Sequence, residues 1–343
     1  MTQTDSHSPT PGTSTTTGRI VWVNGKYVPE AAAGVSIFDS AMMFGDMVFE
    51  MTRSFNRKQF KLRQHLDRLY RSAKMLRIPE PMPVDQLEKL TLEVIEINQP
   101  HMDQDEEDRM MVNLSRGILT SYHPIFGGDP GPTLIISNFP LSLTIASFAG
   151  IFDDGLHAVT PLQRAIPADL LDPKMKNRSR LFYMMANQQV SLVDDPTAWA
   201  LLLDHDGYVT EGTGANFFIV VENELWTPEP RNILRGITRE HTMELARRAG
   251  ITVREKNIEL YDVVNADEAF YTSTPACIYP CTKINGQPIG DGRIGTMTQK
   301  LIGDWSTDVG VDIVDQTRRY AQRAQHTTLS EGATMYRFGQ KKT

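Results

Sequence analysis

The 343-residue chain contains only two cysteines, Cys277 and Cys281. A single pair four residues apart is too small for a disulfide framework and lacks the second pair of ligands that a zinc site needs. Such sparing use of cysteine is typical of proteins in a reducing compartment. We therefore expect both thiols to lie in or near the core, and the chain to be cytoplasmic and without a bound metal.

Positive charge is in deficit, because 35 lysines and arginines stand against 42 aspartates and glutamates, for a net charge of -7. A chain without a basic surplus cannot neutralise many phosphates, which excludes nucleic acid and anionic membranes as expected partners. No apolar run reaches the roughly 18 residues that cross a bilayer. Residues 1–18 contain no lysine, arginine or apolar core, so they predict a disordered tail and not a secretory signal.

What the sequence does contain is the composition of a globular protein, with 40% hydrophobic residues over a length sufficient for two domains. Residues 19–137 alternate hairpin-like and helical patterns, beginning with Asn24-Gly25 between two short apolar runs, and predict a small α+β domain. Residues 138–150 are expected to form a connector. A large β-barrel-like α/β domain is expected over residues 151–310, and a C-terminal extension over residues 311–343.

The stretch "LDPKMKNRSRLFYMMANQQ" (171–189) places two lysines, Lys174 and Lys176, at the start of a pattern that predicts a helix over residues 176–193. A lysine near a helix start is most often solvated surface charge. The alternative is an amine held in a pocket for covalent chemistry, since burial readily shifts the pKa of lysine. The remaining motifs are needed to decide between these interpretations.

Further stretches carry candidate site residues, and each has an ordinary structural explanation when taken singly. Glu211 follows a predicted strand and precedes two glycines, which is also the pattern of a turn. Gly236 opens a predicted helix whose first N–H groups belong to Ile237 and Thr238, a place that can hold a phosphate but is also a plain helix start. The other candidates are a helical arginine and two hydroxyl residues at a strand end: Arg68, Ser273 and Thr274.

Together and in this order, six motifs resemble the class IV (fold type IV) pyridoxal-phosphate-dependent aminotransferases: "FGDMVFEMTR", "HLDRLYRSAKML", "KMKNRSRL", "TEGTGANFF", "RGITRE" and "FYTSTPA". That family includes branched-chain and D-amino acid aminotransferases, aminodeoxychorismate lyase and R-selective amine transaminases. The resemblance covers residues 19–310. It implies a two-domain fold that combines α+β and α/β parts, pyridoxal 5'-phosphate (PLP) as cofactor, and a homodimer. It also implies transfer of an amino group from an amino donor to a 2-oxo acid in a ping-pong cycle.

The resemblance also implies a role for each candidate residue. Lys176 begins the family spacing in "KNRSRL", so it would bind PLP covalently and act as the general base, with Lys174 as a solvated neighbour. Glu211 would pair with the pyridine nitrogen and favour its protonated form. Arg180 would approach the phenolic oxygen, unless it is an exposed helical arginine. The phosphate would be held by Arg68, Ile237, Thr238, Ser273 and Thr274.

Substrate choice is not fixed by the resemblance. Branched-chain enzymes hold the α-carboxylate largely on backbone N–H groups of the turn that here reads Thr274-Pro275-Ala276, and Pro275 has no N–H. D-amino acid enzymes use an arginine and a histidine after the strand that here reads "NLSRGIL", where this chain offers Tyr122 and His123 but no arginine. We therefore expect His123 and Tyr122, with Arg116 as the fallback, to bind the carboxylate.

The side-chain pocket and the reaction type leave alternatives open. Phe44 and the methionines beside it predict an apolar pocket for the substrate side chain, although such a stripe is more often core. A PLP lyase of the aminodeoxychorismate type shares the lysine spacing, and an R-selective amine transaminase would need no α-carboxylate site. A non-catalytic PLP-binding protein would not need the intact set of lysine, glutamate and phosphate ligands.

Overall fold

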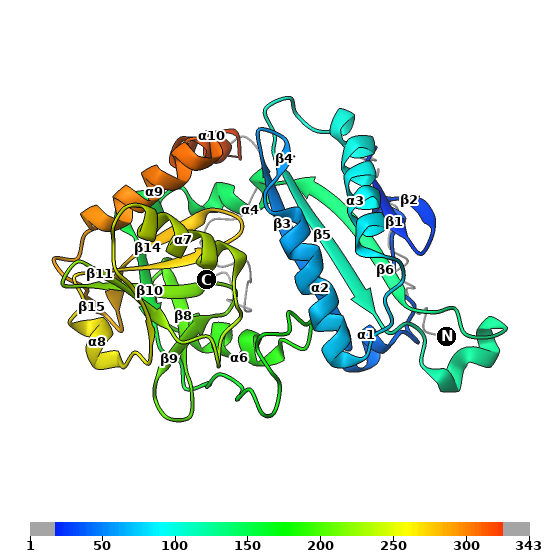
Figure 1. The fold of residues 1–343 in the computed structure, drawn as a ribbon, viewed down its shortest axis with the longest axis horizontal. Coiled ribbons are helices and arrows are strands. Elements are labelled where there is room, and N and C mark those ends of the chain that lie inside the picture. The colour runs from blue at the N-terminus through cyan, green and yellow to red at the C-terminus, as the bar shows by residue number, and fades with distance from the viewer. Residues whose placement is uncertain (1–17, 325–343) are drawn as a thin grey trace, which may run out of the picture.

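The computed structural model describes residues 18–324, so nearly all of the predicted N-terminal tail and most of the C-terminal extension lie outside the described residues. Two sheets of six and nine strands organise this part of the chain and lie side by side in Figure 1. The mixture of helices and strands is that of the predicted fold class. The division of the chain at residues 138–150 stays a prediction, supported by the fact that the two sheets share no strand.

The six-stranded sheet has the order β2-β1-β6-β5-β3-β4. The predicted hairpin at its edge is confirmed, since Asn24 and Gly25 both adopt the positive φ that a tight two-residue turn requires. The bounds of the strands are β1 (Ile20–Val23), β2 (Lys26–Pro29), β3 (Met47–Phe55), β4 (Lys58–Gln59), β5 (Asp108–Ser115) and β6 (Thr133–Pro140).

Helices α2 (Leu62–Leu76) and α3 (Val84–Asn98) cover one face of this sheet. Their apolar stripes pack on alternate residues of β3 and β5, including Val48, Met110 and Val112. Because side chains alternate between the faces of a strand, the odd-numbered residues of β3 and β5 point to the opposite face. The remaining elements of this part are η1 (Glu30–Ala32), α1 (Ser40–Phe44), η2 (Gln99–His101) and η3 (Thr120–Phe126).

The nine-stranded sheet has the order β12-β11-β10-β13-β14-β7-β8-β9, and β9 also pairs with β10. This last pairing, between Glu211 and Asn216, closes part of the sheet into a ring, as the predicted barrel-like architecture requires. The bounds are β7 (Leu156–Val159), β8 (Ala198–Leu203), β9 (Val209–Gly212), β10 (Asn216–Val221), β11 (Glu224–Pro228), β12 (Val253–Lys256), β13 (Glu268–Ser273), β14 (Cys277–Ile284) and β15 (Gln287–Pro288).

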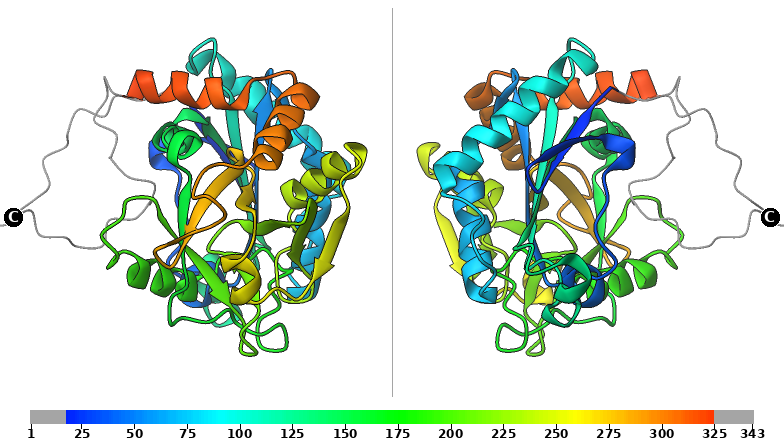
Figure 2. Two further views of the ribbon diagram at one scale, coloured as in Figure 1. Left: turned by 90° about the vertical axis from the view of Figure 1, so that its left-hand side faces the viewer. Right: turned by 90° about the vertical axis from the view of Figure 1, so that its right-hand side faces the viewer.

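Helix α10 lies against both parts of the molecule. Its Gln316 accepts a hydrogen bond of 2.5 Å from Nη2 of Arg53 in β3, and Tyr320 donates to the carbonyl of Asp105. Figure 2 shows α10 along the top of the molecule. The helices that follow β6 are α4 (Ser142–Ile145), η4 (Ala146–Phe148), α5 (Ile151–Asp154), α6 (Leu181–Val190), α7 (Ile237–Arg248), α8 (Leu260–Val264), α9 (Thr296–Val309) and α10 (Ile313–Ala324).

The helix predicted from residue 176 begins only at Leu181, so that part of the prediction is wrong. The N–H of Phe49 donates to the carbonyl of Lys176 at 2.9 Å, and the N–H of Arg178 donates to that of Met47 at 2.8 Å. These β-type bonds hold residues 176–178 extended along β3. Arg180 therefore precedes the helix, contrary to the expectation that it lies one helical turn after Lys176.

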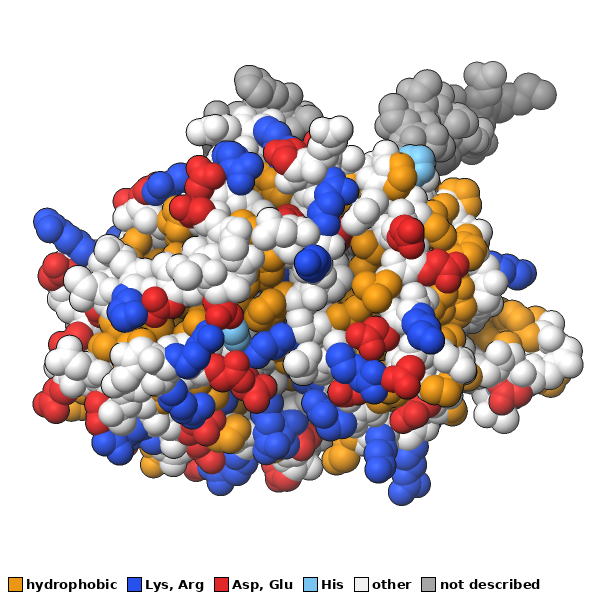
Figure 3. Space-filling model, turned by 45° about the horizontal axis from the view of Figure 1, so that its top comes forward, with side chains coloured by type: hydrophobic (Ala, Val, Ile, Leu, Met, Phe, Trp, Pro, Cys, Tyr) orange, Lys and Arg blue, Asp and Glu red, His pale blue; other side chains and the backbone are white. Residues whose placement is uncertain are grey.

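The surface in Figure 3 carries basic and acidic side chains interspersed, without a continuous basic area on that face. Within residues 18–324, no helix is long and apolar enough to cross a membrane. The same residues contain no group of three or more His, Cys, Asp or Glu side chains placed to hold a metal ion.

Candidate active site

A cavity lies where residues of α2, the segment before α6, and the strand ends of the barrel meet. It is lined by all seven residues that the resemblance assigns to the cofactor: Arg68, Lys176, Glu211, Ile237, Thr238, Ser273 and Thr274. These residues come from distant parts of the sequence. Their convergence on one cavity supports the roles predicted for them, which remain predictions.

Lys176 is the lysine that enters the cavity. Its extended backbone along β3 directs the side chain toward Phe49, and Nζ lies 4.9 Å from the centroid of that ring. Burial lowers the pKa of Lys176 to about 7, so a large fraction of the amine is neutral at physiological pH. Lys174 does not line this cavity, because its Nζ pairs with Asp172 at 2.8 Å and donates to the carbonyl of Arg231.

Glu211 is a buried carboxylate on strand β9 of the nine-stranded sheet. Its Oε1 accepts a hydrogen bond from the hydroxyl of Tyr183 at 3.0 Å, and its Oε2 accepts from Nδ2 of Asn216 and from the N–H of Leu234. Burial raises the pKa of Glu211 to about 7 despite these donors. A carboxyl group in such surroundings is well suited to pair with a cationic ring N–H, since that charge would stabilise its ionised form.

Arg68 is held by a buried ion network on α2 and β3. Its Nε and Nη2 bind the two oxygens of Glu50 at 2.5 and 2.8 Å, and His65 contacts Glu50 at 2.7 Å. Although burial alone would raise the pKa of Glu50, the Arg68 guanidinium and His65 hold it well below its usual range. Nη1 of Arg68 donates to the carbonyl of Arg235, one residue before the glycine that precedes α7.

The N-terminus of α7 forms the other wall of this end of the cavity. A Cβ atom at Gly236 would lie 2.1 Å from Oδ1 of Asn216, so no larger residue fits there. No side chain caps the helix, which leaves the N–H groups of Ile237 and Thr238 outside the helical hydrogen bonds. Oγ1 of Thr272, which also lines the cavity, is buried without a partner among the described residues. N–H groups, hydroxyls and a guanidinium are the donors that a phosphate ester needs. Together with the lysine and the carboxylate, they fit PLP.

The turn after β13 offers fewer N–H donors than expected. Pro275 has none, and the N–H of Ala276 donates to the hydroxyl of Tyr279 at 3.0 Å. The carbonyl of Pro275 accepts 2.7 Å from Nη1 of Arg53. Tyr279 also accepts the hydroxyl of Ser273 at 3.0 Å. Arg53 and Tyr279 therefore both hold the turn by hydrogen bonds. Residues 275 and 276 have no free backbone N–H for a substrate carboxylate.

Arg180 also lines the cavity. Its Nη2 donates to the carbonyl of Thr213 at 3.2 Å, and its guanidinium lies 4.6 Å from the ring centroid of Tyr183. It is therefore not the exposed helical arginine of the alternative interpretation.

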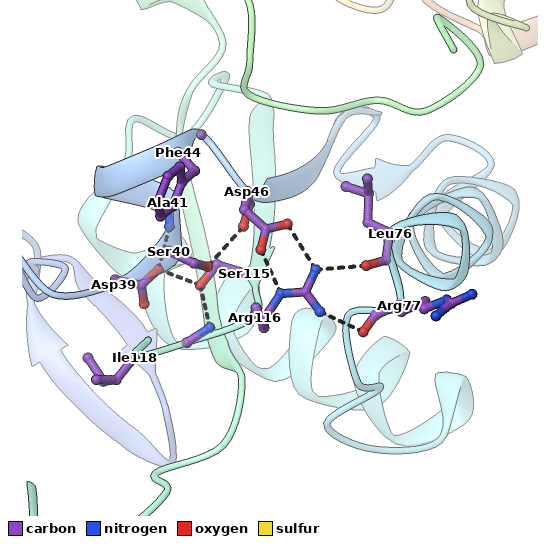
Figure 4. A network of polar contacts seen from close by, with 12 residues as sticks. Asp39, Ser40, Ala41, Phe44, Asp46, Leu76, Arg77, Ser115, Arg116 and Ile118 are labelled. Atoms are coloured by element: carbon purple, nitrogen blue, oxygen red, sulfur yellow. Dashed lines mark hydrogen bonds and ion pairs between the residues drawn. The ribbon is translucent and has the colours of Figure 1, made fainter. Parts of the chain in front are cut away.

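The four substrate candidates lie elsewhere. Arg116 is bound by Asp46 and by the carbonyls of Leu76 and Arg77, as Figure 4 shows. Nε2 of His123 contacts the carbonyl of Ile118 at 2.9 Å. The other two candidates, Tyr122 and Phe44, are likewise not among the residues that line this cavity. Within one chain the structure therefore does not bring these residues to the cofactor site.

Several residues of the site were not predicted from the sequence. Asn216 lies inside the motif "TEGTGANFF" and Glu50 inside "FGDMVFEMTR", but neither residue was assigned a role. Tyr183 carries no such signal, because its contact with Glu211 depends on how α6 packs against the barrel.

A family model described as amino-transferase class IV matches residues 47–284. The chain is 36% identical over 302 residues to a predicted branched-chain-amino-acid aminotransferase of Methanocaldococcus jannaschii, covering 86% of this chain and 99% of that protein. It is 30% identical over 282 residues to the D-alanine aminotransferase of Bacillus licheniformis, covering 82% and 94%. A crystal structure of the branched-chain amino acid aminotransferase of Thermobaculum terrenum in its PLP form has a TM-score of 0.73 and 25% identity, covering 89% and 97%.

Proposed function

We propose, for a chain that belongs to the class IV aminotransferases, transfer of an amino group from an amino acid to a 2-oxo acid in a ping-pong cycle. Enzymes of this family use PLP, and the protein is a PLP-dependent aminotransferase. The proposed donors are amino acids with apolar, branched-chain-like side chains or D-amino acids. Support for them comes from the names of the relatives and from apolar cavity residues such as Ile166, Leu171 and Leu202.

The observation that carries the proposal is the presence of Lys176 and Glu211 in one cavity with Arg68 and the N-terminus of α7 beside them. PLP supplies an electron sink for the bonds at the substrate α-carbon when it is bound. We propose that Nζ of Lys176 binds the cofactor and, once released, carries the proton from the α-carbon, for which a pKa of about 7 is well matched. Glu211 would hold the ring N–H, and Arg68 with the α7 N-terminus would anchor the phosphate.

An exchange assay tests this proposal. The purified protein with PLP is incubated with a panel of L- and D-amino acids and 2-oxoglutarate or pyruvate, and new amino and 2-oxo acids are quantified. Transfer from apolar amino acids is expected. Without an acceptor, a transaminase stops after releasing one equivalent of 2-oxo acid per active site, so continued release beyond one equivalent would instead indicate a lyase. Absence of any exchange would contradict the proposal.

A second candidate is an amine transaminase, which one observation favours. The turn at residues 274–276 has no free N–H at Pro275 or Ala276, so the backbone there does not supply the expected carboxylate site. Including simple chiral primary amines in the panel distinguishes the candidates. Amines that are far better donors than every amino acid would support the second candidate.

We further propose that the active form is a homodimer in the cytoplasm. Large apolar side chains are exposed on and around α1 and η3, among them Met42, Phe44 and Phe126. These two elements adjoin, since Asp39 and Ile118 form a β-bridge beside them. Such a patch is typical of an interface between protein chains. It also contains Tyr122 and His123, so a second copy docked here would bring these candidates close to another chain.

A further inference from the structure

On the face of the six-stranded sheet opposite α2 and α3, the adjacent strands β3 and β5 have a single opening, which is a partly exposed pair of side chains. Every residue of β3 and β5 is buried except Met51 and Met111, which are cross-strand partners. Successive pairs on one face of a sheet are about 7 Å apart along the strands. The pairs on this face are, in order, Phe49–Asn113, Met51–Met111 and Arg53–Arg109. The opening at Met51–Met111 is thus the next pair along from Phe49–Asn113, and the ring of Phe49 contacts Lys176.

Two arginines border this opening from opposite ends. The guanidinium of Arg178 donates to Oδ1 of Asn113 through Nε and Nη2, at 3.1 and 2.7 Å, and its Nη2 lies 3.0 Å from the sulfur of Met111. Arg109 reaches from the other end, with Nη2 3.6 Å from the sulfur of Met51. A thioether sulfur is a weak acceptor, so Nη2 of Arg109 is only weakly bound at Met51, whereas Nη2 of Arg178 is also held by Asn113.

Arg109 is a buried cation that forms no ion pair with any carboxylate of residues 18–324. It is 9% exposed, and its Nε–H has no acceptor among the described residues. Burial lowers the pKa of Arg109 to about 10, which still leaves it charged at neutral pH. Its cross-strand partner Arg53, in contrast, has acceptors for its donors, because it donates to the carbonyls of Ser54 and Pro275 and to the side chain of Gln316. A buried charge that is not paired is costly, and an anionic ligand bound to Arg109 would offset that cost.

We propose that Arg109 and Arg178 bind the carboxylate of the substrate over the Met51–Met111 pair. This inference rests on the proposed function and names the carboxylate site of its substrate. A donor whose amino group reacts beside Lys176 lies against Phe49, and its carboxylate extends toward the opening one pair away. A guanidinium pair replaces the backbone donors that the turn at residues 274–276 lacks. The substrate is therefore an amino acid and not a simple amine.

The test compares binding of a carboxylate with binding of its neutral analogue. Dissociation constants of the PLP-loaded enzyme for 4-methylpentanoate and 4-methylpentanamide are measured by titration calorimetry. The variants are Arg109→Gln, Arg178→Gln and Arg109→Lys, with Arg254→Gln at an exposed surface pair as control. Loss of either arginine is expected to weaken binding of the acid about 10- to 100-fold and to leave the amide unchanged. Arg109→Lys is expected to restore part of the affinity.

Unchanged affinity for the acid in both glutamine variants would overturn the proposal, as would equal affinity of the wild type for acid and amide. If Arg109→Gln does not fold, Arg178→Gln and Arg109→Lys decide the question. Steady-state kinetics give a second readout, because the KM for an amino acid should rise in the variants while that for the matching primary amine stays constant. If the wild type exchanges no amino group at all, the proposed function fails, whereas the binding comparison still decides on this site.

Discussion

Asn216 donates a hydrogen bond of 2.9 Å to Glu211, and the same two residues are the register pair that joins β10 to β9. The carboxylate proposed to hold the ring nitrogen of the cofactor therefore lies on the seam where the barrel closes. Its geometry is fixed by strand pairing and by Tyr183 and Leu234, and does not depend on a mobile side chain.

Lys174 and Lys176 are expected to behave differently when replaced. Lys176→Ala should reduce transamination by at least about 100- to 10,000-fold, because it removes both the attachment point and the proton carrier. Lys174→Ala should retain most of the activity, since Lys174 pairs with Asp172 outside the cavity. Borohydride reduction and peptide mapping check the assignment. A pyridoxyl label on Lys174 would contradict it.

Glu211 is expected to make the stability of the cofactor-free protein depend on pH. Its folded pKa of about 7 lies above the usual 4.5, so between these values the folded state binds more protons than the unfolded state. Its contribution is therefore present below pH 4.5 and is lost as pH rises through 7. Glu211→Gln removes this slope, so the variant should gain about 3 kcal/mol relative to wild type between pH 4.5 and 7.

Urea unfolding at several pH values measures that difference. Lys176→Met serves as the matched control. Burial lowers the pKa of Lys176 to about 7 from 10.5, so its folded state binds fewer protons than the unfolded state between pH 7 and 10.5. In the wild type, Lys176 therefore makes stability rise with pH over that higher window, and Lys176→Met removes this rise. The variant should keep the slope that Glu211 produces at lower pH, extended to somewhat higher pH because Lys176 no longer lowers the pKa of Glu211. A Glu211→Gln profile parallel to wild type from pH 4.5 to 7 would show that the carboxyl group is not perturbed.

The Glu50 network is expected to matter for both folding and cofactor retention. Glu50→Gln leaves the buried Arg68 and His65 without their carboxylate, which should cost about 3–5 kcal/mol in the free energy of unfolding. PLP should also dissociate faster, because Arg68 loses its orientation. Glu224→Gln breaks the exposed pair with Arg254 and should leave the free energy of unfolding nearly unchanged, because solvent screens that pair. Equal effects of the two variants would contradict the role of this network.

If the active form is the proposed dimer, the exposed apolar patch around Phe44 should be needed for both assembly and activity. Phe44→Asp places a charge in the exposed apolar patch and should shift the protein toward monomer in light scattering, with loss of activity. A fully active monomer would contradict the proposal.

Subunit mixing tests the role of His123 separately. His123→Ala is expected to raise the KM for amino acids by about two- to a hundredfold, the range of a hydrogen bond to a carboxylate. Mixing Lys176→Ala with His123→Ala subunits creates a site that combines Lys176 with the partner subunit's His123. Activity with low KM should then reappear. Its absence, with exchange of subunits demonstrated, would place His123 outside the site.

The sequence predicted the parts of the molecule that depend on local chemistry. The turn at Asn24-Gly25 and the spacing of apolar residues in α2 depend on residues close together in the sequence, and both elements form as expected. The helix expected from residue 176 does not begin there, because hydrogen bonds to β3 override the local helical pattern. A contact between segments more than 100 residues apart leaves no periodic signal.

The candidate site was likewise predictable from the sequence only in part. Motif positions predicted that Lys176, Glu211 and the residues proposed to bind the phosphate meet, and all of them line one cavity. The lack of an N–H at Pro275 was also visible in the sequence. The occupation of the Ala276 N–H by Tyr279 was not, and neither was the pairing of Arg53 with Arg109, because these depend on strand register and on packing between the sheets.

The contact of Arg53 with both Pro275 and Gln316 determines how short a working version of the chain can be. The match to the family model ends at residue 284, whereas Gln316 lies in α10, well past that boundary. A fragment trimmed to the matched region would lack Gln316, so Arg53, which also holds the carbonyl of Pro275, would lose one of its acceptors. The useful C-terminal limit for expression or for fusion of a tag is therefore set by α10 and not by the extent of family similarity.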